Sequence, residues 1–355
     1  MNTVKKVLNH IFIDGLSGMA MGLFATLIVG TILSQVGTLL IGGKVGSFLF
    51  STGKVASLLT GAGIGCAVAN KFKSSPLVVV SAAVCGMVGA YASQILGGGM
   101  INGNAFAINA PGEPLGEFVG AYVGMLAGNI VSNKTKVDII VTPVVAIVIG
   151  CMAALFVGPP ISRFMTYLGS LVNWGTEQQP FLMGIVVSVL MGIFLTLPIS
   201  SAAIGVSLGL SGIAAGAATV GCCCNMIGFA VASYRENKVG GLISQGLGTS
   251  MLQMPNIIRH PLIWVPAIVS SAILGPVSTM IFEMTSNPVG SGMGTAGLVG
   301  PIMSFQTMSQ TMSPVTALVF NFLMYFIFPA IISLVVSEFM RKHRLINQGD
   351  MSLRS

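Results

Sequence analysis

Charged side chains are scarce in this chain of 355 residues. Asp, Glu, Lys and Arg make up only 7% of it and hydrophobic residues 54%. A soluble domain carries about 25% charged residues. Apolar runs recur at the length of about 20 residues that a helix needs to cross a hydrocarbon core. The composition therefore excludes an ordinary soluble domain and predicts a membrane protein.

Residues for catalysis and metal binding are scarce as well. The three histidines, His10, His260 and His343, lie near the ends of predicted helices, and no phosphate-binding loop ending in Gly-Lys-Ser/Thr occurs,. The six cysteines lie in apolar segments, and the consecutive cysteines 222–224 would point about 100° apart on a helix, so they cannot converge on one metal,. We therefore expect no cofactor, no metal, no catalytic residue and no ATP-driven transport by this chain alone.

What the chain does contain is a series of apolar segments, which we interpret as ten membrane-spanning helices, five in each half. They are 15–38, 53–70, 76–96, 115–132 and 138–157, then 181–204, 207–233, 261–282, 295–312 and 315–340. Short stretches of the first half recur in the second: Ile64 to Asn70 resembles 227–233, and Gly22 to Gly30 resembles 184–192. Such echoes indicate a duplicated chain, and an odd number of spans in each half gives the two repeats opposite orientations.

The predicted fold class is an all-α polytopic membrane protein with two inverted five-helix repeats, each with a broken, re-entrant segment. The predicted parts are a first repeat (1–157), a connector (158–180), a second repeat (181–345) and a cytoplasmic tail (346–355). Aromatic and apolar residues of the connector fall near helical spacing, which is typical of an amphipathic helix at the membrane surface,. An eleventh span is the alternative for this connector.

Positive charges indicate the orientation in the membrane. With both termini cytoplasmic, the inside set is Lys5, Lys6, Lys71, Lys73, Lys134, Lys136, Arg341, Lys342, Arg344 and Arg354, and the outside set is Lys44, Lys54, Arg163, Arg235, Lys238 and Arg259. Ten against six agrees with the positive-inside rule. The net charge of +7 is thus explained by topology and contact with anionic lipid, without a basic stripe for nucleic acid,.

Glycine is abundant, with 46 residues, and five of them from Gly112 to Gly128 are spaced four apart. On a helix this spacing forms a ridge of small residues, which lets helix backbones approach closely in lipid. Close packing alone and helices that slide past one another are both compatible with the ridge.

Two segments are too rich in Gly and Pro for regular spanning helices, 97–117 and 283–294, and they occupy equivalent places in the two halves. Irregular backbone persists at membrane depth only where protein or a watery cavity satisfies its polar groups. Paired broken segments therefore predict a solute-binding site.

The candidate solute-binding residues are scarce polar groups in or near these segments. They are Asn109, Glu113, Glu117, Glu283, Asn287, Ser200, Ser201, Asn225 and His260. A carboxylate inside a bilayer costs about 2.5–3.5 kcal/mol, so its presence indicates a partner or a function. The alternatives are that the carboxylates lie in wet loops, that Asn109 and Asn287 satisfy loop backbone, that Ser200, Ser201 and Asn225 join helices, and that His260 is interfacial.

The run from Asn109 to Glu117, Asn-Ala-Pro-Gly-Glu-Pro-Leu-Gly-Glu, lies between Gly-rich spans. With the segment from Glu283 to Gly300, it resembles the membrane component IIC of bacterial phosphotransferase-system sugar transporters. More narrowly, the chain is similar to the stand-alone IIC-like group that includes the perfringolysin O regulator protein. The similarity extends over nearly the whole chain.

This resemblance implies a ten-helix inverted-repeat protein of the bacterial inner membrane, often a homodimer, that binds a sugar between a scaffold and a moving unit. It also implies a sugar-binding glutamate, for which Glu113 or Glu283 is the candidate, and a histidine, for which His260 is the candidate. No IIA or IIB domain is attached and no cytosolic cysteine can carry phosphate, so coupled phosphorylation needs separate IIA and IIB partner proteins.

We therefore expect a transporter that moves a small polar solute, a sugar or related compound, by alternating access. It is not expected to be an enzyme by itself, although it can act as the membrane part of a sugar phosphotransferase. The alternative is a membrane sensor that regulates gene expression and binds a solute without transporting it. An intramembrane enzyme is a third class, for which the sequence offers no nucleophile or metal site.

Overall fold

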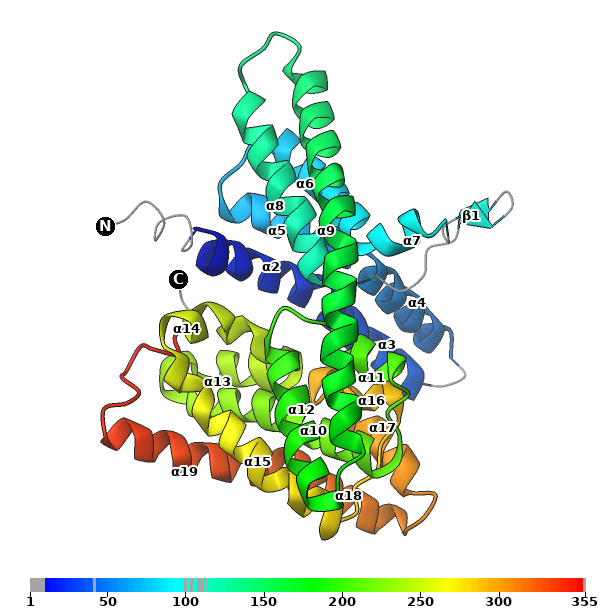
Figure 1. Cartoon of the computed structure of the whole chain (residues 1–355), viewed down its shortest axis with the longest axis vertical. Helices are drawn as coiled ribbons and strands as arrows, with labels where there is room; N and C mark the ends of the chain where they lie inside the picture. Colours follow the sequence, from blue (N-terminus) through cyan, green and yellow to red (C-terminus); the bar gives the residue numbers. More distant parts are fainter. Residues whose placement is uncertain are drawn as a thin grey trace. The chain divides into compact units, whose positions relative to one another are not determined.

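The computed structural model describes residues 10–40, 43–98, 101–102, 105–106, 112 and 114–353. These residues are helical almost throughout, and strands β1 (Ile101–Asn102) and β2 (Ala105–Phe106) form one short antiparallel hairpin. The chain divides into two compact units, Met1–Met165 and Thr166–Ser355, which we call unit 1 and unit 2 and describe one at a time (Figure 1).

Unit 1 consists of helices that pack in pairs, α2 on α5, α3 on α4, α5 on α6 and α6 on α8. The elements are η1 (His10–Gly15), α2 (Leu16–Leu23), η2 (Phe24–Ile28), α3 (Val29–Leu39), α4 (Lys44–Leu58), α5 (Thr60–Lys71), α6 (Pro76–Ala90), α7 (Ala92–Leu96), α8 (Pro114–Val131) and α9 (Asp138–Thr176). Helix α9 has 39 residues, so it is about 58 Å long, and it continues through most of the predicted connector into unit 2,.

Four of the five glycines of the predicted ridge, Gly116 to Gly128, lie on α8 and form a packing surface, whereas Gly112 precedes the helix. A Cβ atom added to Gly120 would lie 2.8 Å from Ala154 of α9, and one added to Gly124 would lie 2.6 Å from the Cys85 sulfur of α6. The small residues therefore let α8 approach both neighbouring helices closely, as the spacing predicts.

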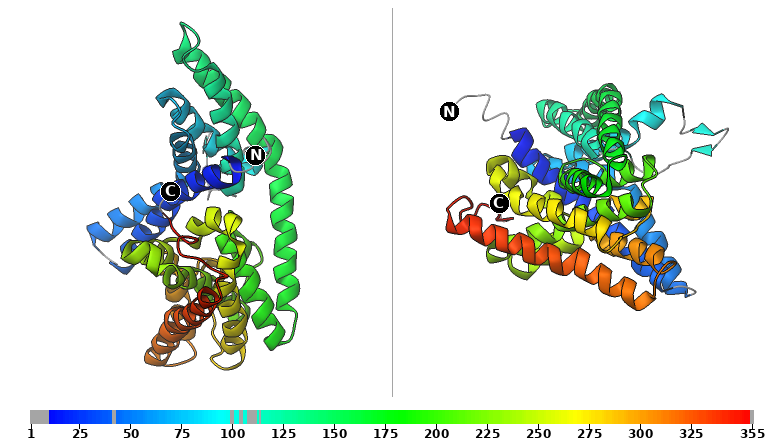
Figure 2. Two further views of the ribbon diagram at one scale, coloured as in Figure 1. Left: turned by 90° about the vertical axis from the view of Figure 1, so that its left-hand side faces the viewer. Right: turned by 60° about the horizontal axis from the view of Figure 1, so that its bottom comes forward.

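Unit 2 has a core of three helices that lie side by side, α10, α12 and α15, with α19 packed against α12 and α15 (Figure 1). Its elements are α10 (Pro180–Thr196), α11 (Ser201–Ser207), α12 (Gly212–Ala232), α13 (Tyr234–Ile243), η3 (Ser244–Gly248), η4 (Ser250–Gln253), α14 (Met254–Arg259), η5 (Pro261–Trp264), α15 (Val265–Met280), α16 (Pro288–Ser291), η6 (Ala296–Leu298), α17 (Val299–Met308), α18 (Pro314–Phe322), η7 (Leu323–Ile327) and α19 (Phe328–Lys342). The last three form one long rod, coloured orange to red in Figure 2.

Helices α10 and α12 run parallel, although the sequence predicts them as two successive spans. Gly221 packs on Ser188, and Asn225, one turn later, contacts Gly192 and Thr196, which follow Ser188 on α10. The chain from 197 to 211, which contains α11, therefore travels back along the unit before α12 begins.

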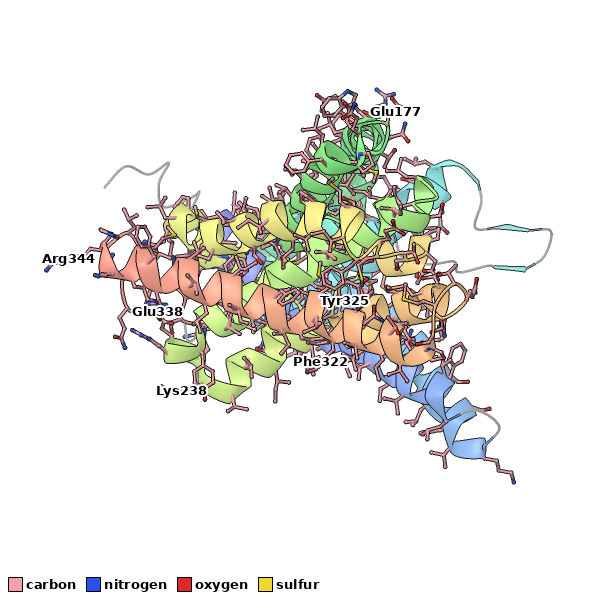
Figure 3. The ribbon with its side chains drawn as sticks, turned by 90° about the horizontal axis from the view of Figure 1, so that it is seen from below. Glu177, Lys238, Phe322, Tyr325, Glu338 and Arg344 are labelled. Atoms are coloured by element: carbon pink, nitrogen blue, oxygen red, sulfur yellow. The ribbon has the colours of Figure 1, made fainter. Side chains whose placement is uncertain are left out.

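One end of unit 2 gathers charged residues that the sequence analysis assigned to opposite sides of the membrane. Arg235 pairs with Glu338 at 2.7 Å, and Arg341 pairs with Glu236 at 3.0 Å. Figure 3 shows Lys238, Glu338 and Arg344 at this same end. A salt bridge cannot span a hydrocarbon core of about 30 Å.

The assignment of Arg235, Lys238 and Arg259 to the outside is therefore wrong for a C-terminus on the inside. Arg259 belongs to the same end, because its neighbour His260 lies 3.7 Å from Asp350 of the C-terminal tail. Moving the three cations changes the predicted count from ten against six to thirteen against three. The corrected count fits the positive-inside rule much better.

The protein is a helical membrane protein, since its outer surface is strongly apolar. Phe156, Ile139 and Val315 are 84%, 73% and 72% exposed, which is expected where lipid replaces water,. Among the described residues five helices are long and apolar enough to cross a membrane, or six if the bent pair α4 and α5, with its 58° kink, is one span. The ten spans of the prediction are therefore not confirmed.

Candidate functional site

Three breaks in helical structure meet inside unit 2. We call 197–211 the first break, 244–250 the second and 283–300 the third. The second begins with the π-helix η3 and the third contains the short helices α16 and η6. Broken helices leave backbone groups without intrahelical partners, and within a membrane these groups need partners from the protein or from a polar cavity.

The third break contacts both of the others. The Thr295 hydroxyl donates to the Gly246 carbonyl of the second break at 2.5 Å. The Ser201 hydroxyl of the first break donates to the Gly292 carbonyl at 2.7 Å. Thr295 is fully buried and Ser201 is 4% exposed, so both hydrogen bonds lie inside the protein.

The backbone of the third break is held in an unusual conformation. Glu283 and Leu298 have positive φ angles of 44° and 60°, and Gly294 and Gly297 have 51° and 54°. Left-handed backbone costs a residue with a side chain about 1–2 kcal/mol. Such conformations persist only where surrounding contacts impose them, and they cluster at functional sites.

Hydroxyl and amide side chains impose this shape on the third break. Asn287 caps α16 by accepting the Gly290 N–H at 2.9 Å, and Thr219 of α12 donates to the Gly290 carbonyl at 3.3 Å. The Ser304 hydroxyl donates to the Thr285 carbonyl at 2.7 Å and accepts the Tyr325 hydroxyl at 2.6 Å. Tyr325 is fully buried and lies on the π-helix η7 (Figure 3), a local widening that is frequent at functional sites,.

A buried polar cluster on α10, α12 and α15 contacts the second break through Ser250. Asn225 accepts from Trp264 Nε1 at 2.9 Å and from Thr196 at 3.2 Å, and its amide donates to Ser271 at 3.2 Å. Thr196 in turn bonds Ser250 of the second break at 2.8 Å. Asn225 therefore joins helices, which is one of the two alternatives for this residue.

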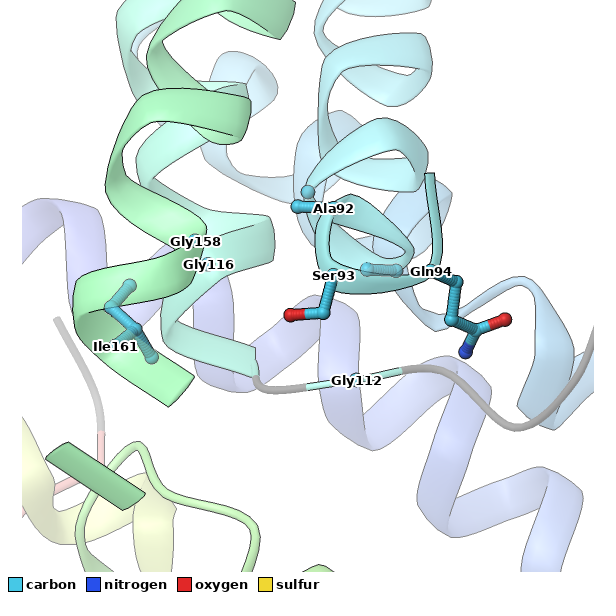
Figure 4. A pocket seen from close by; sticks show the side chains of 9 residues that line it. Ala92, Ser93, Gln94, Gly112, Gly116, Gly158 and Ile161 are labelled. Atoms are coloured by element: carbon cyan, nitrogen blue, oxygen red, sulfur yellow. The ribbon is translucent and has the colours of Figure 1, made fainter. Parts of the chain in front are cut away.

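Unit 1 holds a buried carboxylate beside a cavity. Glu117 is fully buried in the first turn of α8, where the helix dipole favours a negative charge,. The preceding residue, Gly116, lines a cavity of about 170 Å³ together with Ser93, Gly158 and Ile161, a volume that holds several water molecules. In Figure 4 the Ser93 hydroxyl points toward Gly116 and Gly158, whereas Gln94 points away.

A profile of the family described as Phosphotransferase system, EIIC matches residues 13–353. The chain belongs to this family. No curated protein and no solved structure gives a significant match. The predicted resemblance to component IIC is therefore confirmed, and the EIIC protein is a membrane transporter component.

Unit 2 of this EIIC protein brings some of the predicted site residues together and separates others. Ser200, Ser201 and Asn287 belong to the first and third breaks. Glu283 opens the third break with an exposed side chain. His260 lies at the other end of α15, a helix of 16 residues or about 24 Å, so one small solute cannot contact both His260 and Glu283,.

In unit 1 Glu117 is buried, and Asn109 and Glu113 lie outside the described residues. Their roles stay predictions. Sequence reasoning missed the second break altogether, and with it Gln245, Ser250 and the Thr295 contact. The signal was present, since Gly240, Gly241, Gly246, Gly248 and Pro255 interrupt this segment much as Gly and Pro interrupt 283–294. Among the residues that the structure describes, no cluster of His, Cys, Asp and Glu could hold a metal ion.

Proposed function

We propose that this EIIC protein moves a small polar solute, a sugar or related compound, across the bacterial inner membrane by alternating access. The observation that carries the proposal is the convergence of three broken segments inside unit 2. Their carbonyls and hydroxyls are the type of group that sugar hydroxyls bind. The short helices α16 and η6, which lie among residues with positive φ, offer the mobile elements that alternating access requires,.

Unit 1 contributes a separate candidate for solute binding, the buried carboxylate of Glu117. A carboxylate binds hydroxyl donors strongly, because hydrogen bonds to a charged group are about twice as strong as neutral ones. Its position beside the cavity supports a role in solute binding, and Asn109 and Glu113, which precede it in the sequence, extend this proposed acceptor set. A buried intramembrane carboxylate is a functional candidate on energetic grounds alone.

The finer features of the prediction belong to the same proposal. We propose inverted repeats that place broken segments in both halves, cytoplasmic termini, and a homodimer. Separate IIA and IIB proteins supply phosphate where transport is coupled to phosphorylation. The corrected charge count, thirteen against three, supports the cytoplasmic placement of the C-terminal end,.

Uptake of labelled sugars into proteoliposomes tests the proposal, with and without added IIA and IIB proteins. Glu117→Gln keeps the shape of the side chain and removes its charge, so we expect uptake to fall at least tenfold with an unchanged melting temperature. Glu177→Gln is the matched control, because Glu177 is exposed at the end of α9 (Figure 3), and its uptake should stay at the wild-type level.

A second pair of variants tests unit 2. Thr295→Val removes the hydrogen bond that closes the second break against the third, and we expect uptake to rise at least threefold, whereas Thr311→Val changes an exposed threonine and should have no effect. Equal uptake by Thr295→Val and wild type would refute a solute path through these breaks. Solute binding without flux in the wild-type protein would favour the sensor alternative.

A further inference from the structure

The C-terminal tail of the chain, residues 345–353, is docked into the segment 234–260 that contains the second break. Met351 is fully buried and Ile346 is 2% exposed. Both belong to a hydrophobic cluster with Phe229, Ile257 and Ile263. The segment is therefore held by specific contacts, although α19 ends before it at Lys342.

Three side-chain amides of the segment 234–260 bind the backbone of the tail. Asn237 and Gln253 donate to the Met351 carbonyl at 2.8 Å and 2.9 Å. Asn256 donates to the Ser352 carbonyl at 2.9 Å, and Asn237 also accepts the Leu353 N–H at 2.8 Å. These three amides, which bind main-chain groups on consecutive residues 351–353, form a binding site for a peptide backbone that we call the cradle.

A buried ion pair holds the start of the tail. Arg341 contacts both oxygens of Glu236 at 3.0 Å and 3.2 Å, and the Gly349 N–H donates to the same carboxylate at 3.3 Å. The Arg341 and Glu236 side chains are only 9% and 4% exposed. Glu236 thus links the end of α19, the tail and the start of α13.

The same amides connect the tail to the candidate site. Gln253 donates to Gln245 at 2.9 Å as well as to the tail, and Gln245 is the second residue of η3. The next residue, Gly246, accepts the hydrogen bond from Thr295 of the third break. Three steps of hydrogen-bonded contact therefore lead from the Met351 carbonyl to the third break.

We propose that the tail is an intramolecular latch, and that its cradle on 234–260 is a peptide-binding site that the chain fills with its own C-terminus. With the tail docked, Gln253 and Gln245 are fixed and the second break stays closed against the third. With the tail released, the amides lose their backbone partners and the second break gains freedom to move. The consequence for transport rests on the proposed function, whereas the locking of the second break does not.

Hydrogen–deuterium exchange on the full chain in detergent tests the latch. Met351→Asp places a charge in the apolar part of the cradle, and Gln348→Asp places the same charge on an exposed tail residue. We expect exchange in 236–256 to rise at least tenfold for Met351→Asp, with α12 and α15 unchanged, and to stay at the wild-type level for Gln348→Asp. A peptide of residues 345–355, added in excess to the Met351→Asp protein, should restore protection, and the same peptide carrying Met351→Asp should not.

Two results would overturn the latch. Unchanged exchange in 236–256 would show that the tail does not lock the second break. Increased exchange throughout unit 2, without rescue by the peptide, would show that the tail is part of the folding core. In proteoliposomes we expect at least threefold faster uptake for Met351→Asp than for Gln348→Asp, and equal rates with a released tail would also refute the latch. If wild-type protein shows no uptake of any solute, the proposed function fails while the exchange experiment still decides on the latch.

Discussion

The two units of this EIIC protein solve the same packing problem in different ways. Unit 1 brings α6, α8 and α9 together through glycines, with few polar groups between them. Unit 2 surrounds its broken helices with hydroxyls and amides. Of the buried polar side chains among the described residues, five lie in unit 1 and 22 in unit 2.

The difference follows from the backbone. Lipid supplies no hydrophobic force between helices, so regular helices associate by close packing, for which glycine is sufficient. A broken helix exposes N–H and C=O groups that packing cannot satisfy. In unit 2, side chains such as Thr219, Ser304 and Gln253 therefore form hydrogen bonds with backbone carbonyls. A polar interior in a membrane protein thus marks the places where helices are interrupted.

The largest expected effect is all-or-none and tests the corrected assignment of Lys238 to the same side of the membrane as the end of α19. Lys238→Cys and Arg344→Cys should react with a membrane-impermeant maleimide from the same side of the membrane, and Thr311→Cys, an exposed residue between α17 and α18, only from the other. The six native cysteines are buried or half-buried, which keeps their background low. Reaction of Lys238→Cys and Arg344→Cys from opposite sides would contradict the corrected charge assignment and the salt bridges behind it.

Second in size is the effect of filling a close helix contact in unit 2. A Cβ atom at Gly221 of α12 would overlap backbone atoms of Ser188 on α10. Backbone atoms cannot move aside as the end of a flexible side chain can. Gly221→Ala should therefore cost about 3 kcal/mol of stability, measured by thermal unfolding in detergent. Gly124→Ala in unit 1 should cost less, because the nearest atom there is the Cys85 sulfur, a side-chain atom.

The matched control for both substitutions is Gly240→Ala on α13, where the added Cβ meets nothing within 4 Å. This variant should be neutral or more stable by up to about 1 kcal/mol, because alanine favours a helix over glycine. A larger loss for Gly124→Ala than for Gly221→Ala would reverse the comparison, since it would make unit 1 the less tolerant of the two.

The features of unit 1 follow from local sequence patterns, and many features of unit 2 do not. The four-residue spacing from Gly112 to Gly128 predicts the α8 ridge, and the Gly and Pro residues of 283–294 predict the third break. The sequence of 234–260 indicates a loop in water, because Arg235, Glu236, Asn237 and Lys238 are polar. Residues 245–257 are nevertheless mostly buried, and Gln253 and Asn256 among them contact the tail about 100 residues later, which no local pattern reveals.

The same limit applies to the direction of helices. The apolar runs 181–204 and 207–233 predict two successive spans, but composition cannot show that α10 ends at Thr196 and that 197–211 returns along the unit. The candidate site shares this limit: the residues of the breaks are visible in the sequence, whereas the Thr295–Gly246 contact that joins them is not.

A moderate effect is expected at the polar cluster of unit 2. Asn225→Ala removes hydrogen bonds to Thr196, Ser271 and Trp264 and leaves buried polar groups without partners, so we expect a loss of about 2 kcal/mol,. Asn129→Ala in unit 1 removes one exposed hydrogen bond to Ser74 and should cost less than about 0.5 kcal/mol,. Denaturation in mixed micelles measures both. Equal losses would show that the polar interior of unit 2 contributes no more to stability than a surface contact.

The smallest effect is expected for the exposed ion pair at the charged end of unit 2. Arg235 and Glu338 are in contact at 2.7 Å, but their side chains are 59% and 38% exposed. Water and salt screen such a pair, so a double-mutant cycle with Arg235→Ala and Glu338→Ala should give a coupling below about 1 kcal/mol that decreases as salt is added. A coupling well above 2 kcal/mol, insensitive to salt, would mean that this end is shielded from water. The charged end would then lie within the membrane or an interface, and the contrast between a polar, water-facing end of unit 2 and its apolar flanks would fail.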